Sequence, residues 1–185
     1  MPYEEKTPAA RGNLKADYYQ QMLEQSKKFR AEYHQKKNII HVEEMPWEDS
    51  PQGRIKHLVN EAMDTMECCM DMYLQELAPG SSSGQHRHMA EEVFFVLEGQ
   101  GYDLHWDPSF SVDDKFVWSW EKEAKKYEWE EGDFVYIPPY TTHQHFNADP
   151  KQMARFVTGT SRLVKALGFD WWEQVENVPG YKGKK

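Results

Sequence analysis

Residues 80–99 read GSSSGQHRHMAEEVFFVLEG, and this stretch decides the fold of the chain. His86 and His88 stand two positions apart, so on a strand both imidazoles lie on one face and reach one inward point. Glu92 follows after a short turn and keeps that parity, and Gly99 permits the tight turn that returns the chain. Two imidazoles and a carboxylate form a mixed nitrogen and oxygen site suited to Fe(II), Mn(II), Ni(II), Zn(II) or Cu(II).

A second segment, residues 132–147, reads GDFVYIPPYTTHQHFN. Its apolar strand 134–137 ends at two prolines, and a new strand then carries His143 inward. His145 lies two positions further along and faces the same way. Two interpretations of His145 stay open: a group beside the metal that moves a proton or binds a substrate oxygen, or a hydrogen-bonded strand histidine at the barrel rim.

Neighbouring residues follow the same alternation. Arg87 has the opposite parity to the two histidines around it, so we expect it outside the interior, in an ion pair. Phe94 and Val96 share the parity of Glu92 and are expected to line the interior. For most of the other strand aromatics we expect core and interface packing, namely for Trp106, Trp118, Trp120 and Tyr136.

The two segments resemble the two motifs of the cupin superfamily. The first motif reads Gly, five residues, His-x-His, three residues, Glu, six residues, Gly, and every position is matched. The second reads Gly, five residues, Pro-x-Gly, two residues, His, three residues, Asn, and Tyr140 stands where the family usually has glycine. The matching positions are Gly80, His86, His88, Glu92, Gly99, Gly132, Pro138, His143 and Asn147.

This resemblance implies an all-β fold, the cupin jelly-roll β-barrel, with one divalent metal ion per chain in its mouth. It implies four metal ligands: His86, His88, Glu92 and His143. It also implies homodimers or higher homo-oligomers. Tyr140 borders the second motif and is, with His145, a candidate catalytic residue. The alternative is a metal-free cupin, but metal-free members usually lose ligands, and here all four are present.

Short β-like runs separated by turn formers fill residues 54–160, which we expect to form the barrel. Residues 1–53 are expected to form an N-terminal arm with an amphipathic helix over about 14–37, which docks on the body or on a partner subunit. Residues 161–185 are expected to form a short helix and a tail. The charged insertion at 107–131 predicts a solvated hairpin or helical turn, which also suits a cover for the barrel mouth or a subunit contact.

The composition argues against some partners and cellular locations. Acidic residues number 31 against 22 basic ones, a net charge of −9 that argues against nucleic acid as a partner. We find no apolar run of the ~20 residues needed to span a membrane and no signal-peptide pattern, so the sequence predicts a cytoplasmic protein without a membrane partner. Cys68 and Cys69 are adjacent, and we expect no disulfide between them, in agreement with a reducing compartment.

The favoured function is a mononuclear non-haem Fe(II) dioxygenase acting on a small aromatic or enol-type substrate. Four protein ligands leave positions for substrate and O₂, and Fe(II) is the usual ion for that chemistry. Locally the motifs resemble gentisate-type dioxygenases, and the ligand set looks more like that of quercetin-type enzymes. One alternative is a non-redox isomerase, lyase or cyclase that uses Zn or Mn as a Lewis acid. The other is a cupin that binds a small molecule without turnover, because fold does not decide function.

Overall fold

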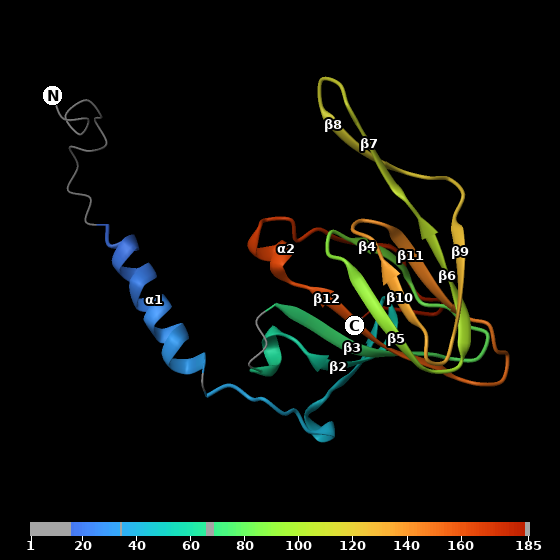
Figure 1. Ribbon diagram of the computed structural model, residues 1–185, viewed down its shortest axis with the longest axis horizontal. Helices are drawn as coiled ribbons and strands as arrows, with labels where there is room; N and C mark the ends of the chain where they lie inside the picture. Colours follow the sequence, from blue (N-terminus) through green and yellow to red (C-terminus); the bar gives the residue numbers. More distant parts are fainter. Residues whose placement is uncertain (1–15, 34, 66–68, 184–185) are drawn as a thin grey trace. The chain divides into compact units, whose positions relative to one another are not determined.

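The computed structural model describes residues 16–33, 35–65 and 69–183 (Figure 1). The chain divides into two compact units, one ending at Lys36 and one beginning at Lys37. The first unit contains helix α1 (Tyr18–Tyr33), which is shorter than the predicted 14–37. Side-chain pairs one turn apart support it, such as Gln20 with Glu24. None of its residues is buried, and the docking of this helix stays a prediction.

Two antiparallel sheets form the second unit (Figure 1). The first has the order β1 (Trp47–Ser50), β2 (Gly53–Val59), β3 (Met70–Leu77), β12 (Ala154–Ser161), β5 (Glu92–Glu98) and β10 (Phe134–Ile137). The second has the order β13 (Trp172–Glu176), β4 (Gln85–His88), β11 (Thr142–Asn147), β6 (Gln100–Trp106) and β9 (Lys125–Glu130). Strands adjacent in space are mostly distant in sequence, which is the pattern of a jelly roll and confirms the predicted all-β barrel.

A compact apolar cluster lies between the sheets. Its members are Leu77, Phe94, Val96, Trp129, Ile137, Ala154 and Phe156. Phe94 and Val96 are fully buried, as their parity with Glu92 predicted. The cluster fills one part of the barrel interior, and many other inward positions carry buried polar side chains, among them the histidines of the motifs.

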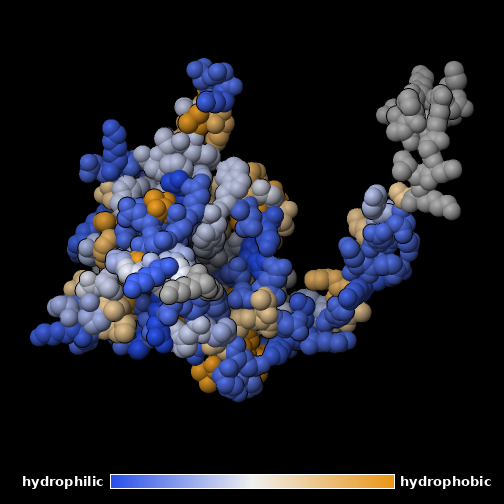
Figure 2. All heavy atoms as spheres, turned by 180° about the vertical axis from the view of Figure 1, so that it is seen from behind, coloured by the Kyte–Doolittle hydropathy of each residue, from blue (hydrophilic) through white to orange (hydrophobic). Residues whose placement is uncertain are grey.

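A third, two-stranded sheet lies within the predicted insertion 107–131. It pairs β7 (Pro108–Val112) with β8 (Phe116–Trp120), and this hairpin projects from the barrel (Figure 1). Hydrophobic residues are visible on the projecting hairpin in Figure 2. Phe110 and Phe116 stack there with ring centroids 5.1 Å apart. The insertion therefore contains a hairpin, as one of the two predictions had it.

Strand pairing extends beyond the predicted barrel limits of 54–160. β1 lies in a stretch that reads as a connector, because Pro51 and Asp49 are turn formers, yet it pairs along its whole length with β2. β13 lies in the predicted tail and pairs with β4. The short elements that remain are the 3₁₀ turns η3 (Val42–Glu44) and η4 (Glu61–Met63) and the helix α2 (Leu163–Ala166).

Two further points concern the sequence predictions. Cys68 lies outside the described residues, so the expectation about the cysteine pair stays a prediction. Within the described part of the chain, no helix has both the length and the apolar character needed to cross a bilayer.

Candidate metal centre

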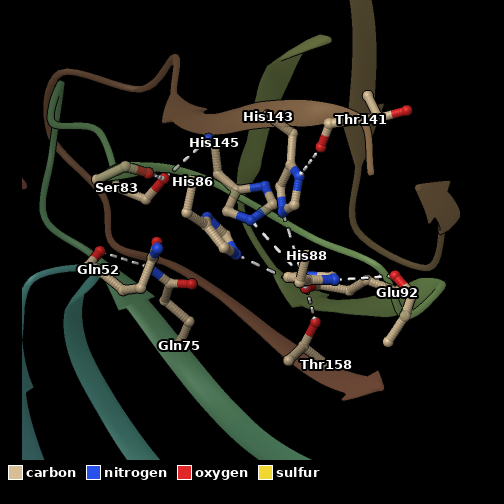
Figure 3. Close-up of polar contacts among 12 residues, drawn as sticks. Gln52, Gln75, Ser83, His86, His88, Glu92, Thr141, His143, His145 and Thr158 are labelled. Atoms are coloured by element: carbon tan, nitrogen blue, oxygen red, sulfur yellow. Dashed lines mark hydrogen bonds and ion pairs between the residues drawn. The ribbon is translucent and has the colours of Figure 1, made fainter. Parts of the chain in front are cut away.

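Four side chains from three strands meet between the sheets (Figure 3). β4 contributes His86 and His88, β11 contributes His143, and β5 contributes Glu92 from the opposite sheet. The register places His143 directly opposite His86. One donor atom of each side chain lies within 4.8 Å of the others, and all four side chains are buried. The structure therefore brings the four predicted ligands together.

Hydrogen bonds fix two of the rings in the tautomer that a metal ligand requires. Nδ1 of His88 lies 2.8 Å from the carbonyl oxygen of Ala90, and Nδ1 of His143 lies 2.9 Å from that of Thr141. A carbonyl oxygen only accepts, so each Nδ1 donates its proton and each inward Nε2 keeps a lone pair. Metal-binding imidazoles are normally held in this way, with the outer nitrogen bonded to a fixed acceptor.

The inward donor atoms are spaced as a metal ion would require. Oε2 of Glu92 lies 2.9 Å from Nε2 of His88 and 3.7 Å from Nε2 of His143. The same oxygen lies 3.9 Å from Nε2 of His86. Two donor atoms that each lie about 2.1 Å from one metal ion are separated by about 3–4 Å. These distances therefore suit four ligands of a single ion.

Missing hydrogen bonds support the same conclusion. Among the described residues, Nε2 of His143 and both ring nitrogens of His86 are buried with no hydrogen-bond partner. Buried polar atoms are nearly always paired, so each exception needs an explanation. A cation at the centre of the cluster supplies the partner that the inward nitrogens lack. The buried cluster thus fits a divalent metal site.

Burial and neighbouring groups shift the pKa of three side chains of the cluster, His86, His143 and Glu92. Burial and the charge of His143 lower the pKa of His86 well below its usual value, and burial lowers the pKa of His143. Burial acts to raise the pKa of Glu92, but the neighbouring imidazoles of His143 and His88 outweigh it and hold the pKa well below its usual value. Neutral imidazoles beside an ionised carboxylate are the states that bind a metal.

His145 lies beside the cluster and is fully buried. Its Nδ1 is 3.0 Å from Oδ2 of Asp103. Its Nε2 is 3.9 Å from Oε1 of Glu92 (Figure 3). That Nε2 has no hydrogen-bond partner within the described chain. Burial favours the neutral ring, but the charge and hydrogen bond of Asp103 outweigh it and raise the pKa of His145. His145 therefore faces the interior next to the metal ligands, and its role there stays a prediction.

Asp103 is a functional candidate that the sequence did not reveal. Its Oδ1 accepts a hydrogen bond from the indole nitrogen of Trp129 at 2.8 Å, and Oδ2 lies 3.4 Å from Nε2 of His105. Burial would raise the pKa of Asp103, but the charge of His145 and these hydrogen bonds lower it to about 2. The only signal in the sequence is the spacing of Asp103 and His105, two positions apart on β6 and so on one face.

Tyr140 is not part of the cluster. Its ring packs against Trp118 and Trp120, with centroids 4.8 and 5.2 Å away, and its hydroxyl donates to Glu173 at 3.3 Å. The predicted catalytic role of Tyr140 finds no support in these contacts. Tyr140 has φ of 59°, the left-handed conformation that the family's glycine adopts easily, so the turn is kept without glycine.

Arg87 lies outside the interior, as predicted. It forms an ion pair with Glu173, and its guanidinium lies 3.4 Å from the centroid of the Trp120 ring. Arg87 thus joins three elements around the mouth of the barrel: β4, β13 and the hairpin strand β8. This contact holds the strand of His86 and His88 from its outer side.

Trp172 covers the metal ligands from the edge of the sheet. Its ring stacks on His88 with centroids 4.4 Å apart and on His86 with centroids 5.8 Å apart. Beside it lies a cavity of about 110 Å³, lined in part by His88, Arg162 and Trp171. The sequence did not reveal this role, because residues 171 and 172 were expected only to lie between a short helix and the tail.

Comparisons with known proteins agree with the motifs. The family model described as auxin binding protein matches residues 34–174. Auxin-binding protein T85 of Nicotiana tabacum is 27% identical over 137 residues, which cover 72% of this chain and 69% of that protein.

Solved structures show the same fold. The polyketide cyclase RemF of Streptomyces resistomycificus is 15% identical with a TM-score of 0.50, covering 80% of this chain and 88% of that one. A mutant of Bacillus subtilis oxalate decarboxylase is 16% identical with a TM-score of 0.51 over 66% of this chain. This chain spans only 28% of that decarboxylase. From the family match and the shared fold, this chain is a cupin and belongs to the auxin-binding-protein family.

Proposed function

We propose that the chain is a metal-dependent enzyme that acts on a small organic molecule, and that in its specific form it is a mononuclear non-haem Fe(II) dioxygenase with an aromatic or enol-type substrate. The observation that carries the proposal is His145. Its Nδ1 is held by the buried carboxylate of Asp103, and its Nε2 is buried without a partner beside Glu92. Turnover requires a group that exchanges a proton with the bound molecule, and His145 is placed to serve as that group.

The proposed roles follow from the contacts. His86, His88, Glu92 and His143 would hold the metal ion. When bound, the metal would polarise a substrate oxygen, and Fe(II) would also supply redox chemistry with O₂.

His145 would hold or accept a proton at Nε2. Asp103 would keep the ring in the orientation that presents this nitrogen to the substrate. Trp172 would keep bulk water from the rings of the ligands.

A second candidate is a binding protein without turnover. The observation that favours it is the family match, because the curated relatives are named for binding auxin. Auxins such as indole-3-acetic acid are small aromatic carboxylic acids, so the same metal site would suit both functions. A cavity of about 110 Å³ beside His88 offers space next to the cluster.

The test is an oxygen-uptake assay on protein purified without O₂ and loaded with Fe(II). We expect uptake that depends on one member of a panel of catechols, gentisate-like acids, flavonols and β-diketones. His145→Gln should keep the metal, measured by elemental analysis, and lose the uptake. His57→Gln is the matched control, because His57 pairs with Glu48 away from the cluster.

Other results would decide against the dioxygenase. Product formed without O₂ by the Zn- or Mn-loaded protein would favour an isomerase, lyase or cyclase. Metal-dependent binding of indole-3-acetic acid in a calorimeter, with no product from any compound, would favour the binding protein.

A further inference from the structure

The two carboxylate oxygens of Glu92 face different partners (Figure 3). Oε2 points to the three histidine nitrogens of the cluster, the nearest of them 2.9 Å away on His88. Oε1 accepts a hydrogen bond from Oγ1 of Thr158 at 2.8 Å. Nε2 of His145 lies 3.9 Å from Oε1. The hydroxyl of Tyr73, which the register of β3 and β12 places beside Thr158, is also close: burial raises the pKa of Tyr73, and the charge of Glu92 raises it further. One oxygen is thus directed to the metal site, while the other is held by a hydroxyl.

Thr158 is well placed to fix this division. It is fully buried on β12, and the register pairs it with Phe94, two residues beyond Glu92 on β5. Its hydroxyl also lies 3.3 Å from the carbonyl oxygen of Val93, but a hydroxyl has one proton, and the shorter contact is to Glu92. Hydrogen bonds to an ionised acceptor are the stronger kind, so the carboxylate is the preferred partner.

Removal of this hydroxyl would take away the hydrogen bond that Oε1 of Glu92 accepts and leave this buried, ionised oxygen to find another donor. An unpaired buried charge is costly, so the carboxylate would turn to find a partner. A movement of about 1 Å would bring Oε1 within hydrogen-bond distance of Nε2 of His145, which donates to a carboxylate when both ring nitrogens carry a proton. That contact would draw the carboxylate away from the three nitrogens and would occupy the nitrogen that the substrate needs.

We infer that Thr158 is a positioning residue: it holds Glu92 so that Oε2 serves the metal ion, and it keeps Glu92 apart from His145. The inference rests on the proposed metal site. Hydrogen-bond partners of metal ligands typically change metal affinity by about 10–100-fold when they are removed.

The experiment compares Thr158→Val with wild type in a competition titration of Co(II) against a chromophoric chelator. Valine keeps the branched shape and removes only the hydroxyl, so we expect a folded protein by circular dichroism with a Co(II) dissociation constant raised about 10–100-fold. We also expect a changed visible spectrum of bound Co(II). Thr158→Ser should restore both, because serine returns the hydroxyl. Thr160→Val is the matched control, since Thr160 is buried on the same face of β12.

The outcomes separate this inference from the proposed function. If wild type binds Co(II), and Thr158→Val binds it equally well with an unchanged spectrum, the role of Thr158 is overturned while the metal site stands. If Thr158→Ser behaves like the valine variant, packing and not the hydroxyl is responsible, and the inference is again overturned. If wild type takes up no metal, the proposed function fails and this inference fails with it.

Discussion

Replacement of His86 by leucine should change stability in opposite directions with and without metal. His86 is fully buried, and neither ring nitrogen has a hydrogen-bond partner among the described residues. In the metal-free protein these nitrogens are therefore a cost, whereas in the loaded protein one of them binds the ion. Leucine has a similar volume and no polar atom, so it removes the cost together with the ligand.

The expected size follows from the structure. One unsatisfied buried polar group costs about 1–3 kcal/mol. The leucine variant loses the ring contacts that His86 makes with His143 and Trp172, at centroid distances of 4.0 and 5.8 Å. The leucine side chain makes apolar contacts in their place. We therefore expect the metal-free variant to gain about 1–3 kcal/mol, which for this chain length is roughly 2–4 °C of Tm for each kcal/mol. Metal at 1,000 times its Kd stabilises wild type by about 4 kcal/mol. With metal, wild type should therefore be more stable than His86→Leu.

The assay is thermal unfolding of both proteins after chelation and again with a saturating divalent metal. His57→Leu is the control: His57 pairs with Glu48 at 2.8 Å, so this variant should be less stable in both conditions and keep the full metal shift. A metal-free His86→Leu protein that melts below metal-free wild type would refute the reasoning. Equal metal shifts in the two proteins would show that His86 is no ligand.

Three further predictions concern Asp103 and Tyr140. Asp103→Asn should keep the metal content found by elemental analysis while turnover falls about 10²–10⁴-fold, because His145 loses the anion that orients it; unchanged turnover would contradict this role. The pKa of Asp103 is lowered from 3.8 to about 2, so its ionised form stabilises the fold by about 2 kcal/mol above pH 4, and this contribution is lost as the pH falls through 2. In urea unfolding, the free energy of unfolding of wild type should accordingly exceed that of Asp103→Asn at pH 5, and this difference should shrink towards pH 2. Tyr140→Gly relieves the strain of a left-handed backbone conformation but removes a buried ring, so chemical denaturation should show a net loss of about 2–4 kcal/mol in the free energy of unfolding. A gain in this free energy would mean that backbone strain outweighs packing.

The sequence determined those parts of the site that depend on local periodicity. On a strand, residues two apart share a face, so His86 with His88 and His143 with His145 had to point the same way wherever the strands lay. The spacing of the two motifs placed Glu92 with them. The same alternation correctly placed Arg87 outside the interior. The strand at 134–137 was also predicted with its observed limits, because an apolar run stops at two prolines.

Only the tertiary structure decided which residues support the ligands. Asp103 bonds to His145 across 42 positions, and Thr158 bonds to Glu92 across 66. Trp172 reaches His88 only because β13 pairs with β4 at the edge of the sheet. Apart from the spacing of Asp103 and His105, no local pattern marks these three residues for such contacts. Their partners are set by strand order and by the facing of two sheets, which depend on how the whole chain buries its apolar residues.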